Sequence, residues 1–167
     1  MTEENELQRL RRRVARLEDI EAIRALKVQY GRFCDPTHDL DGMMALFTED
    51  AIFDIGEEYG SYSGHGEIRA FLEGADDIML WAIHYMIAPQ IELADNGLSA
   101  HGTWYLWQLG TMPNPDGEGR EPVWIAGVYH DDLVKIDGRW RFRKVALRMQ
   151  IMSPYSEGWV KTPWIGQ

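Results

Sequence analysis

Apolar residues recur at helical spacing through the first thirty positions of the chain. The stripe consists of Leu7, Leu10, Val14, Leu17, Ile20, Ile23, Leu26 and Tyr30. Steps of three and four residues predict one helix over residues 6–35. Pro36 follows, and a proline disfavours helical conformation in the residue before it. We expect the helix to end there. Its first turns, residues 1–16, form a predicted extension that packs on a partner subunit or on the rest of the fold.

Shorter elements are expected between this helix and residue 77. A helix over residues 40–47 follows Asp39, whose side chain suits an N-cap. Residues 51–55 alternate apolar and polar positions as a strand does. Residues 57–64 are rich in Gly, Ser and Tyr and predict a loop, and residues 66–73 predict a third helix.

The period then changes from helical to extended. Four long strands fit residues 81–94, 99–111, 122–136 and 139–152. Asp95-Asn96-Gly97 and Asp137-Gly138 supply the residues that tight hairpin turns need, and Met112–Pro122 is a longer loop. Helices followed by a run of antiparallel strands predict an α+β fold, with the helices on one face of a strongly curved antiparallel sheet.

Strand alternation suggests which side chains meet beneath the helices. The predicted inward sets are Ala82, His84, Met86 and Ala88; Trp104, Leu106, Gln108 and Gly110; and Ala146, Arg148, Gln150 and Met152. Each set is apolar or small apart from one or two polar residues. A few polar groups in an apolar cavity are typical of a small-molecule site. The alternatives are that His84 is a hydrogen-bonded core residue and that Arg148 lies at an edge or in an ion pair.

Two residues at the end of the long helix add to this picture. Asp35 places a carboxylate at a helix C-terminus, where the helix dipole disfavours negative charge. Either a donating partner compensates for it or the side chain is exposed in a turn. Cys34 beside it is interpreted as a buried helix cysteine rather than a nucleophile.

Composition narrows the possible functions. The 167 residues predict a single domain, and the net charge of −10 disfavours binding to nucleic acid or to anionic membranes. Arg11-Arg12-Arg13 is therefore interpreted as a solvated helix face. One cysteine excludes an internal disulfide and fits a reducing compartment, which predicts a cytoplasmic protein. We see no signal peptide, no membrane-length apolar run and no spacing typical of a metal site.

Aromatic residues are numerous, with seven Trp, seven Tyr and five Phe. Side chains of this kind either fill a core or line an apolar pocket. Those considered for a flat cyclic substrate are Tyr62, Trp81, Trp107, Tyr129, Trp159 and Trp164.

Several segments together resemble the SnoaL-like branch of the nuclear transport factor 2-like superfamily. They are Leu17–Ile23 leading to Tyr30 and Asp35, Asp50–Phe53, Ile83–Tyr85, Gly102–Leu106 and Asp137–Phe142. The match covers about residues 17–155, which leaves 156–167 as a tail that could cover the pocket. Within the branch the chain is most similar to bile acid 7α-dehydratases, and more distantly to scytalone dehydratases. It has Gln108 where the bile acid enzymes carry an aspartate.

The resemblance implies a cone-shaped α+β barrel, no metal or organic cofactor, and a homo-oligomer, with a trimer favoured over a dimer. It also implies that Asp35 and His84 form a proton-abstracting pair, with Tyr30 and Arg148 in the pocket. The expected substrate-binding residues are Gln108, Trp107, Tyr129, Trp81, Tyr62 and Met86.

The predicted function is a dehydratase or related lyase acting on a hydrophobic cyclic hydroxy-ketone. His84 would be the base, since a histidine titrates near neutral pH. Asp35 would orient it, Tyr30 would donate a hydrogen bond to oxygen, and Arg148 would steady negative charge. An isomerase or a polyketide cyclase on the same fold would use the same pair. A non-catalytic module that binds a small molecule is the remaining alternative.

Overall fold

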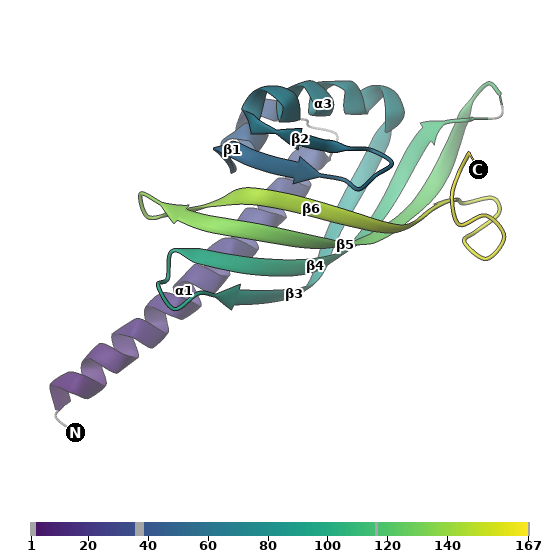
Figure 1. The fold of residues 1–167 in the computed structure, drawn as a ribbon. Coiled ribbons are helices and arrows are strands. Elements are labelled where there is room, and N and C mark those ends of the chain that lie inside the picture. The colour runs from purple at the N-terminus through teal and green to yellow at the C-terminus, as the bar shows by residue number, and fades with distance from the viewer. Residues whose placement is uncertain (1–2, 36–38, 116, 167) are drawn as a thin grey trace.

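A long helix and a six-stranded sheet dominate the computed structural model, which describes residues 3–35, 39–115 and 117–166 (Figure 1). The helices are α1 (Glu3–Cys34), α2 (Leu40–Met44) and α3 (Gly64–Ile78). The strands are β1 (Phe47–Asp54), β2 (Ser61–Ser63), β3 (Trp81–Leu93), β4 (Ser99–Pro113), β5 (Arg120–Ile136) and β6 (Arg139–Pro154). The long helix and the four long strands are confirmed. The segment over residues 57–64 contains β2 rather than only a loop, and α3 is longer than predicted.

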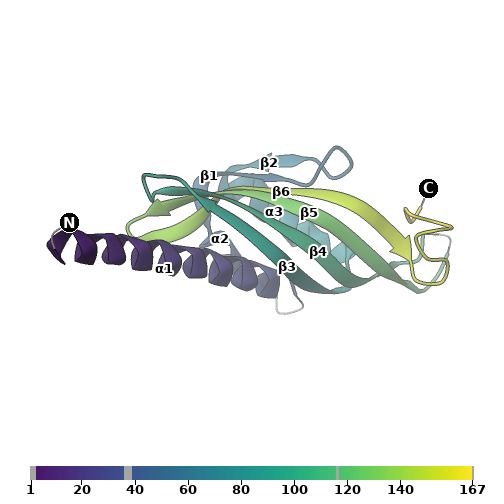
Figure 2. The same cartoon turned by 90° about the horizontal axis from the view of Figure 1, so that it is seen from below.

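The sheet differs from the expected antiparallel barrel. Its strand order is β2-β1-β6-β5-β4-β3, and β1 runs parallel to β6 while all other neighbours are antiparallel. The two edge strands, β2 and β3, do not pair with each other, so the sheet stays open and is not strongly curled (Figure 2). The predicted closed cone is therefore wrong. The class, α+β with helices on one face of the sheet, is confirmed.

Short turns hold the long strands in register. Gly97, Asp137 and Gly138 all have positive φ, of 65°, 50° and 76°, as the predicted hairpin turns require. At the sheet edge, Ala88 has a φ of 52° before Pro89, and the register of β3 shifts there. A proline is tolerated at such a place because an edge strand has backbone N–H groups that no neighbour needs.

The second half of α1 docks on the sheet. The Nζ of Lys135 and the Nε1 of Trp140 both donate to Asp19 Oδ1, at 2.6 and 2.9 Å. Arg16 reaches the carbonyl oxygens of Leu93 and Ala94 at 3.4 and 3.5 Å. From there to its end the helix buries one face, whereas its first turns extend beyond the sheet (Figures 1 and 2).

The core lies between the helices and the inner face of the sheet. Ile23 and Tyr30 of α1 are buried against Phe47 of β1 and Phe142 of β6. The Tyr30 ring meets Phe142 edge-on at 5.7 Å and Phe47 at 6.3 Å. Asp39 caps α2 as predicted, accepting from the N–H of Gly42 at 2.8 Å. No described helix is both long and apolar enough to span a membrane.

Candidate functional site

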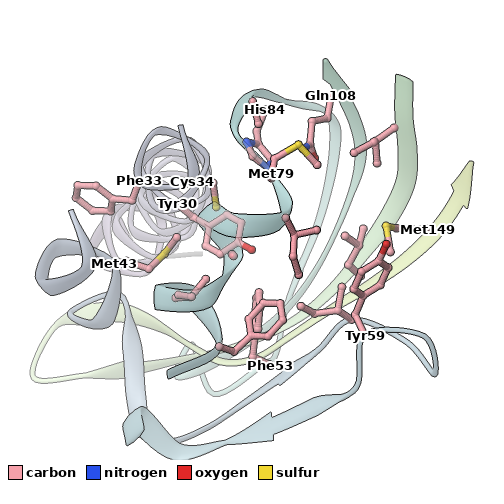
Figure 3. A pocket seen from close by; sticks show the side chains of 18 of the residues that line it. Tyr30, Phe33, Cys34, Met43, Phe53, Tyr59, Met79, His84, Gln108 and Met149 are labelled. Atoms are coloured by element: carbon pink, nitrogen blue, oxygen red, sulfur yellow. The ribbon is translucent and has the colours of Figure 1, made fainter. Parts of the chain in front are cut away.

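An apolar cavity of about 180 Å³ opens between the end of α1, α2, α3 and the inner face of the sheet (Figure 3). Its wall consists of Tyr30, Phe33, Cys34, Leu40, Met43, Phe53, Ile55, Tyr59, Phe71, Leu72, Ala75, Ile78, Met79, Ala82, His84, Gln108, Met112, Ile125, Tyr129, Leu147, Met149 and Met152. This set contains no carboxylate, lysine or arginine among the described residues. The cavity therefore suits a neutral, largely apolar ligand.

His84 and Asp35 form the pair that the sequence predicted. The His84 Nδ1 lies 3.1 Å from Asp35 Oδ1, and the backbone N–H of His84 donates to the same oxygen at 2.9 Å. The His84 side chain is mostly buried, with 12% of its surface exposed, and Asp35 keeps 25%. Asp35 thus lies behind the imidazole rather than in the cavity wall. The unfavourable position of its carboxylate at the end of α1 is compensated by these two donors.

This contact fixes how the imidazole can act. An Nδ1 that donates to a carboxylate places the lone pair of the neutral ring on Nε2. His84 is part of the cavity wall, so the ring can accept a proton from a molecule bound there. The carboxylate stabilises the imidazolium that such a transfer produces. Figure 3 shows His84 beside Gln108, its partner across the β3–β4 ladder.

Two phenols contribute the other polar groups of the deep wall. Tyr30 of α1 meets Tyr129 of β5 edge-on at 5.9 Å, and both are almost fully buried. Desolvation, and then the neighbouring Cys34, raise the pKa of both tyrosines well above the ordinary value of 10.0. Both phenols therefore stay protonated and can serve as hydrogen-bond donors. Tyr30 and Tyr129 were both predicted as pocket residues, and the structure brings them together.

Methionine is unusually frequent in the wall. Met43 lies in α2, Met79 caps the end of α3, Met112 lies near the end of β4, and Met149 and Met152 lie in β6. Methionine side chains are flexible and polarisable, so they can adjust to ligands of different shape. This feature was not predicted, because Met86 was the one methionine expected to bind substrate. Met86 instead packs beside Gly31 of α1, outside the wall.

A buried ion pair beneath the phenols was also missed. The Lys27 Nζ donates to Asp131 Oδ2 at 2.7 Å, and both side chains are fully buried. The ammonium lies 3.4 Å from the centre of the Tyr129 ring and 4.5 Å from that of Tyr30. Burial lowers the pKa of Lys27 and raises that of Asp131, in each case against the attraction of the partner. The pair stabilises the ring positions from behind the cavity.

Arg148 does not lie in the cavity, which corrects the prediction. Its guanidinium forms two hydrogen bonds with Asp54, at 3.0 and 2.6 Å, and half of its side chain is exposed. Leu147 and Met149 face inward instead. The register of β5 against β6 skips one residue at Gln150, so the alternation counted back from Met152 changes face there.

Several aromatic residues chosen from the sequence lie elsewhere. Trp107 stacks on Trp124 on the outer side of the sheet, because its neighbour Gln108 faces inward. Trp81 is half exposed at the start of β3. Tyr62 stacks on Phe71 and donates to the carbonyl of Tyr59, so it supports the wall from behind. Trp107, Trp81 and Tyr62, which were expected to bind substrate, are thus absent from the cavity wall.

The C-terminal tail returns to the end of β6. The Ile165 N–H donates to the Met152 carbonyl at 2.7 Å, and Trp164 forms a parallel bridge with the same residue. Trp159 meets Trp124 edge-on, on the outer side of the sheet. Of the described tail residues, none is part of the cavity wall.

The thiol of Cys34 is predicted to be unreactive in the folded protein. Desolvation raises its pKa from 9.0 to about 12. The thiolate is the reactive form, so at pH 8 we expect native Cys34 to react with an aromatic disulfide reagent about 1,000-fold more slowly than an ordinary thiol. Stopped-flow absorbance would measure both the native rate and the rate in guanidinium chloride. Equal rates in the two solutions would contradict the assignment of Cys34 as an inert wall residue.

No set of three or more His, Cys, Asp or Glu side chains within the described ranges is placed to hold a metal ion. The polar groups of the described cavity wall are thus the His84 imidazole, the phenols of Tyr30, Tyr59 and Tyr129, the Gln108 amide and the Cys34 thiol.

Solved structures with the same fold include several enzymes by name. Hexachlorocyclohexane dehydrochlorinase LinA-type3 from Novosphingobium barchaimii is 22% identical, with a TM-score of 0.76 over 86% of this chain and 94% of its own. A protein provisionally named as a scytalone dehydratase, from Novosphingobium aromaticivorans, is 23% identical, with a TM-score of 0.73 over 84% and 90%. A protein provisionally named as an aromatic ring hydroxylase, from the same organism, is 26% identical, with a TM-score of 0.72 over 83% and 94%.

Sequence comparison identifies the family. Among curated proteins, no sequence matches this chain. The model of the SnoaL-like domain family, however, matches residues 15–146, which is most of the described fold. That range contains the His84–Asp35 pair, both buried phenols and the Lys27–Asp131 ion pair. The chain therefore belongs to the SnoaL-like domain family, as its sequence motifs predicted.

Proposed function

We propose that this protein is a lyase that needs no cofactor and that uses His84 to remove a proton from a neutral, hydrophobic cyclic substrate. The observation that carries the proposal is the imidazole in the cavity wall, held at Nδ1 by Asp35 at 3.1 Å. The carboxylate orients the imidazole, and a base in the wall of an apolar cavity can act on a molecule bound there. Solved structures with this fold include a named dehydrochlorinase and a provisionally named dehydratase, and both names denote elimination reactions.

The composition of the wall limits how protons can move. Among the described wall residues, His84 is the one side chain suited to act as a base, because the wall tyrosines and Cys34 all have raised pKa values and stay protonated. If the leaving group is a hydroxyl, one imidazole must therefore act twice. It takes the proton from carbon, and its imidazolium then returns a proton to the departing oxygen. The carbon–oxygen bond breaks, a carbon–carbon double bond forms, and one water leaves.

The other polar groups suit an activating carbonyl. Removal of a proton beside a carbonyl places negative charge on its oxygen, and protonated phenols are suitable donors for that charge. Tyr30 and Tyr129 lie in the deep wall, and the Gln108 amide lies beside His84. We assign the phenols to the carbonyl oxygen and Gln108 to orientation of the substrate. Gln108 cannot act as an acid, since an amide does not titrate.

The size and neutrality of the cavity favour compact substrates. Its volume of about 180 Å³ lies below the roughly 300–1,000 Å³ of typical drug-sized sites. Arg148, expected to steady an anionic group, is instead bound to Asp54 outside the cavity. We therefore favour a hydroxy-ketone of one or two rings over a bile acid, whose anionic tail would find no cation in the described wall.

A second candidate is dehydrohalogenation, which is favoured because His84 is the one imidazole in the described cavity wall. A halide leaves without being protonated, so a site with one base and no acid is sufficient. Here His84 would accept the proton while the carbon–halogen bond breaks, and the halide would depart as an anion. The phenols would then donate to the halide rather than to a carbonyl oxygen.

The test is a substrate panel with product analysis. Neutral hydroxylated one- and two-ring ketones and chlorinated cycloalkanes would be incubated with the protein, and products would be followed by mass spectrometry and chloride release. We expect turnover that yields an alkene by loss of water or of hydrogen chloride. A product of unchanged mass would instead indicate an isomerase or cyclase, and binding without any product would indicate a binding module.

A further inference from the structure

An apolar stripe on the first half of α1 is left uncovered by the described chain. Leu7, Leu10, Val14 and Leu17 are each between 45% and 65% exposed. This part of the helix extends beyond the sheet, and its contacts with the sheet begin only at Arg16 (Figures 1 and 2). Four large apolar side chains exposed in a row are typical of an interaction surface.

The stripe faces away from the rest of the fold. An α-helix turns by about 100° per residue. Counted in this way, the stripe lies about 150° around the helix from the face that buries Ile23, Lys27 and Tyr30. A second helix could therefore pack on the stripe without meeting the sheet.

The spacing is that of two coiled-coil heptads. Leu7 and Val14 occupy a positions, and Leu10 and Leu17 occupy d positions. The pattern ends at the next a and d positions, where Glu21 and Arg24 pair with each other at 3.5 Å.

Charges on both sides of the stripe match in a parallel pair. In parallel coiled coils a g residue of one helix meets the following e residue of the other. Glu6 at g would meet Arg11 at e of a second copy. Arg13 at g would likewise meet Glu18 at e. Both pairs are attractive, and these four side chains form no ion pair of their own within residues 3–35, 39–115 and 117–166.

The antiparallel arrangement of the same stripe is disfavoured by the same charges. If Leu7 lay opposite Leu17 of the other helix, e positions would face e positions and g positions would face g positions. Arg11 would then meet Arg11 of the other helix, and Arg13 would meet Arg13. Like charges at these positions repel, so the sequence discriminates between the two orientations.

We propose that residues 6–18 of α1 form a short parallel coiled coil with the same residues of a second copy of this chain. The self-complementary charge pattern argues for a second copy rather than for an unrelated helix. In parallel coiled coils, a β-branched residue at a with leucine at d favours a dimer of helices. Val14 occupies one a position here, and leucine occupies both d positions.

Charge reversal provides the first test, with sedimentation velocity as the measurement. The expected mass of the wild type is that of two chains, in place of the three that the family resemblance favours. Arg11→Glu places two glutamates opposite each other and should raise the dissociation constant of the dimer at least tenfold. Adding Glu6→Arg should restore pairing. Arg12→Glu is the matched control, because Arg12 occupies the outer f position and should leave the mass unchanged.

Disulfide trapping provides the second test. In a parallel pair of helices the two copies of Leu10 lie side by side. Leu10→Cys should therefore form an intermolecular disulfide under mild oxidation. Arg12→Cys should react far less, and the wild type controls for Cys34. The proposal would be overturned if the wild type were a monomer or had a mass of more than two chains. It would also be overturned if Arg11→Glu left the dimer unchanged, or if both cysteine variants were trapped equally.

Discussion

Replacement of His84 by glutamine is expected to lower kcat by roughly 10²–10⁴-fold on any substrate that the panel identifies, the range for loss of a general base. Glutamine keeps the size and polarity of the side chain but cannot accept the proton. Because the other titratable groups of the described wall have raised pKa values, nothing in the cavity replaces the imidazole. Steady-state kinetics would show the loss in kcat, and ligand binding should persist.

Asp35→Asn tests whether the carboxylate contributes its negative charge in addition to positioning the His84 backbone. The amide oxygen can still accept the backbone N–H of His84, so the local geometry is retained. The negative charge that stabilises the imidazolium is lost, and the amide can turn its NH₂ group toward Nδ1 and impose the wrong tautomer. We expect kcat to fall by roughly 10²–10⁴-fold with little change in KM.

The chain contains a matched control for both substitutions. His101 Nδ1 lies 3.0 Å from Asp132 Oδ1 on the sheet surface, almost the same geometry as the cavity pair. Both of these side chains are about half exposed and lie outside the cavity. His101→Gln and Asp132→Asn should therefore leave kcat unchanged. If the cavity variants behaved like these surface variants, His84 could not be the base.

Local patterns were sufficient for much of the fold. The hairpin turns at Gly97 and Gly138 and the alternation along β4 depend on neighbouring residues, and both are confirmed. Leu106 and Gln108 face inward as predicted. The pairing of β1 with β6 joins segments about ninety positions apart, and no short-range period encodes it. The open, mixed sheet was missed for this reason.

Site residues were misplaced where the inward–outward alternation of a strand is interrupted, or where a charged residue occupies a buried position of a helix. One skipped residue at Gln150 reversed the face of Arg148. Lys27 lies among the buried positions Ile23, Leu26 and Tyr30 of the α1 stripe, and its charge at such a position was the available signal. A lysine buried in a helix face requires a partner, but only the structure identifies that partner on β5.

The second large effect is a loss of folding stability, expected when the Lys27–Asp131 ion pair beneath the cavity is broken. Lys27→Met removes the ammonium and leaves the Asp131 carboxylate buried without its partner. Breaking a buried pair in this way typically costs about 3–5 kcal/mol, because the remaining charge keeps its desolvation penalty. Asp131→Leu should cost a similar amount for the same reason. Urea unfolding followed by circular dichroism would measure both, and Arg24→Met in the exposed pair with Glu21 should cost less than about 1 kcal/mol.

The double variant decides what holds Lys27 in place. With both charges removed, methionine packs against the rings of Tyr129 and Tyr30 and leucine fills the carboxylate site, so stability should return to within about 1–2 kcal/mol of the wild type. If the single variants fail to fold and the double variant folds, the same conclusion follows. If instead the two losses add, the contacts of the ammonium with the aromatic rings would outweigh its pairing with Asp131. The deep wall would then depend on a cation held by phenols, and removal of Tyr129 would destabilise Lys27 as much as removal of its carboxylate partner.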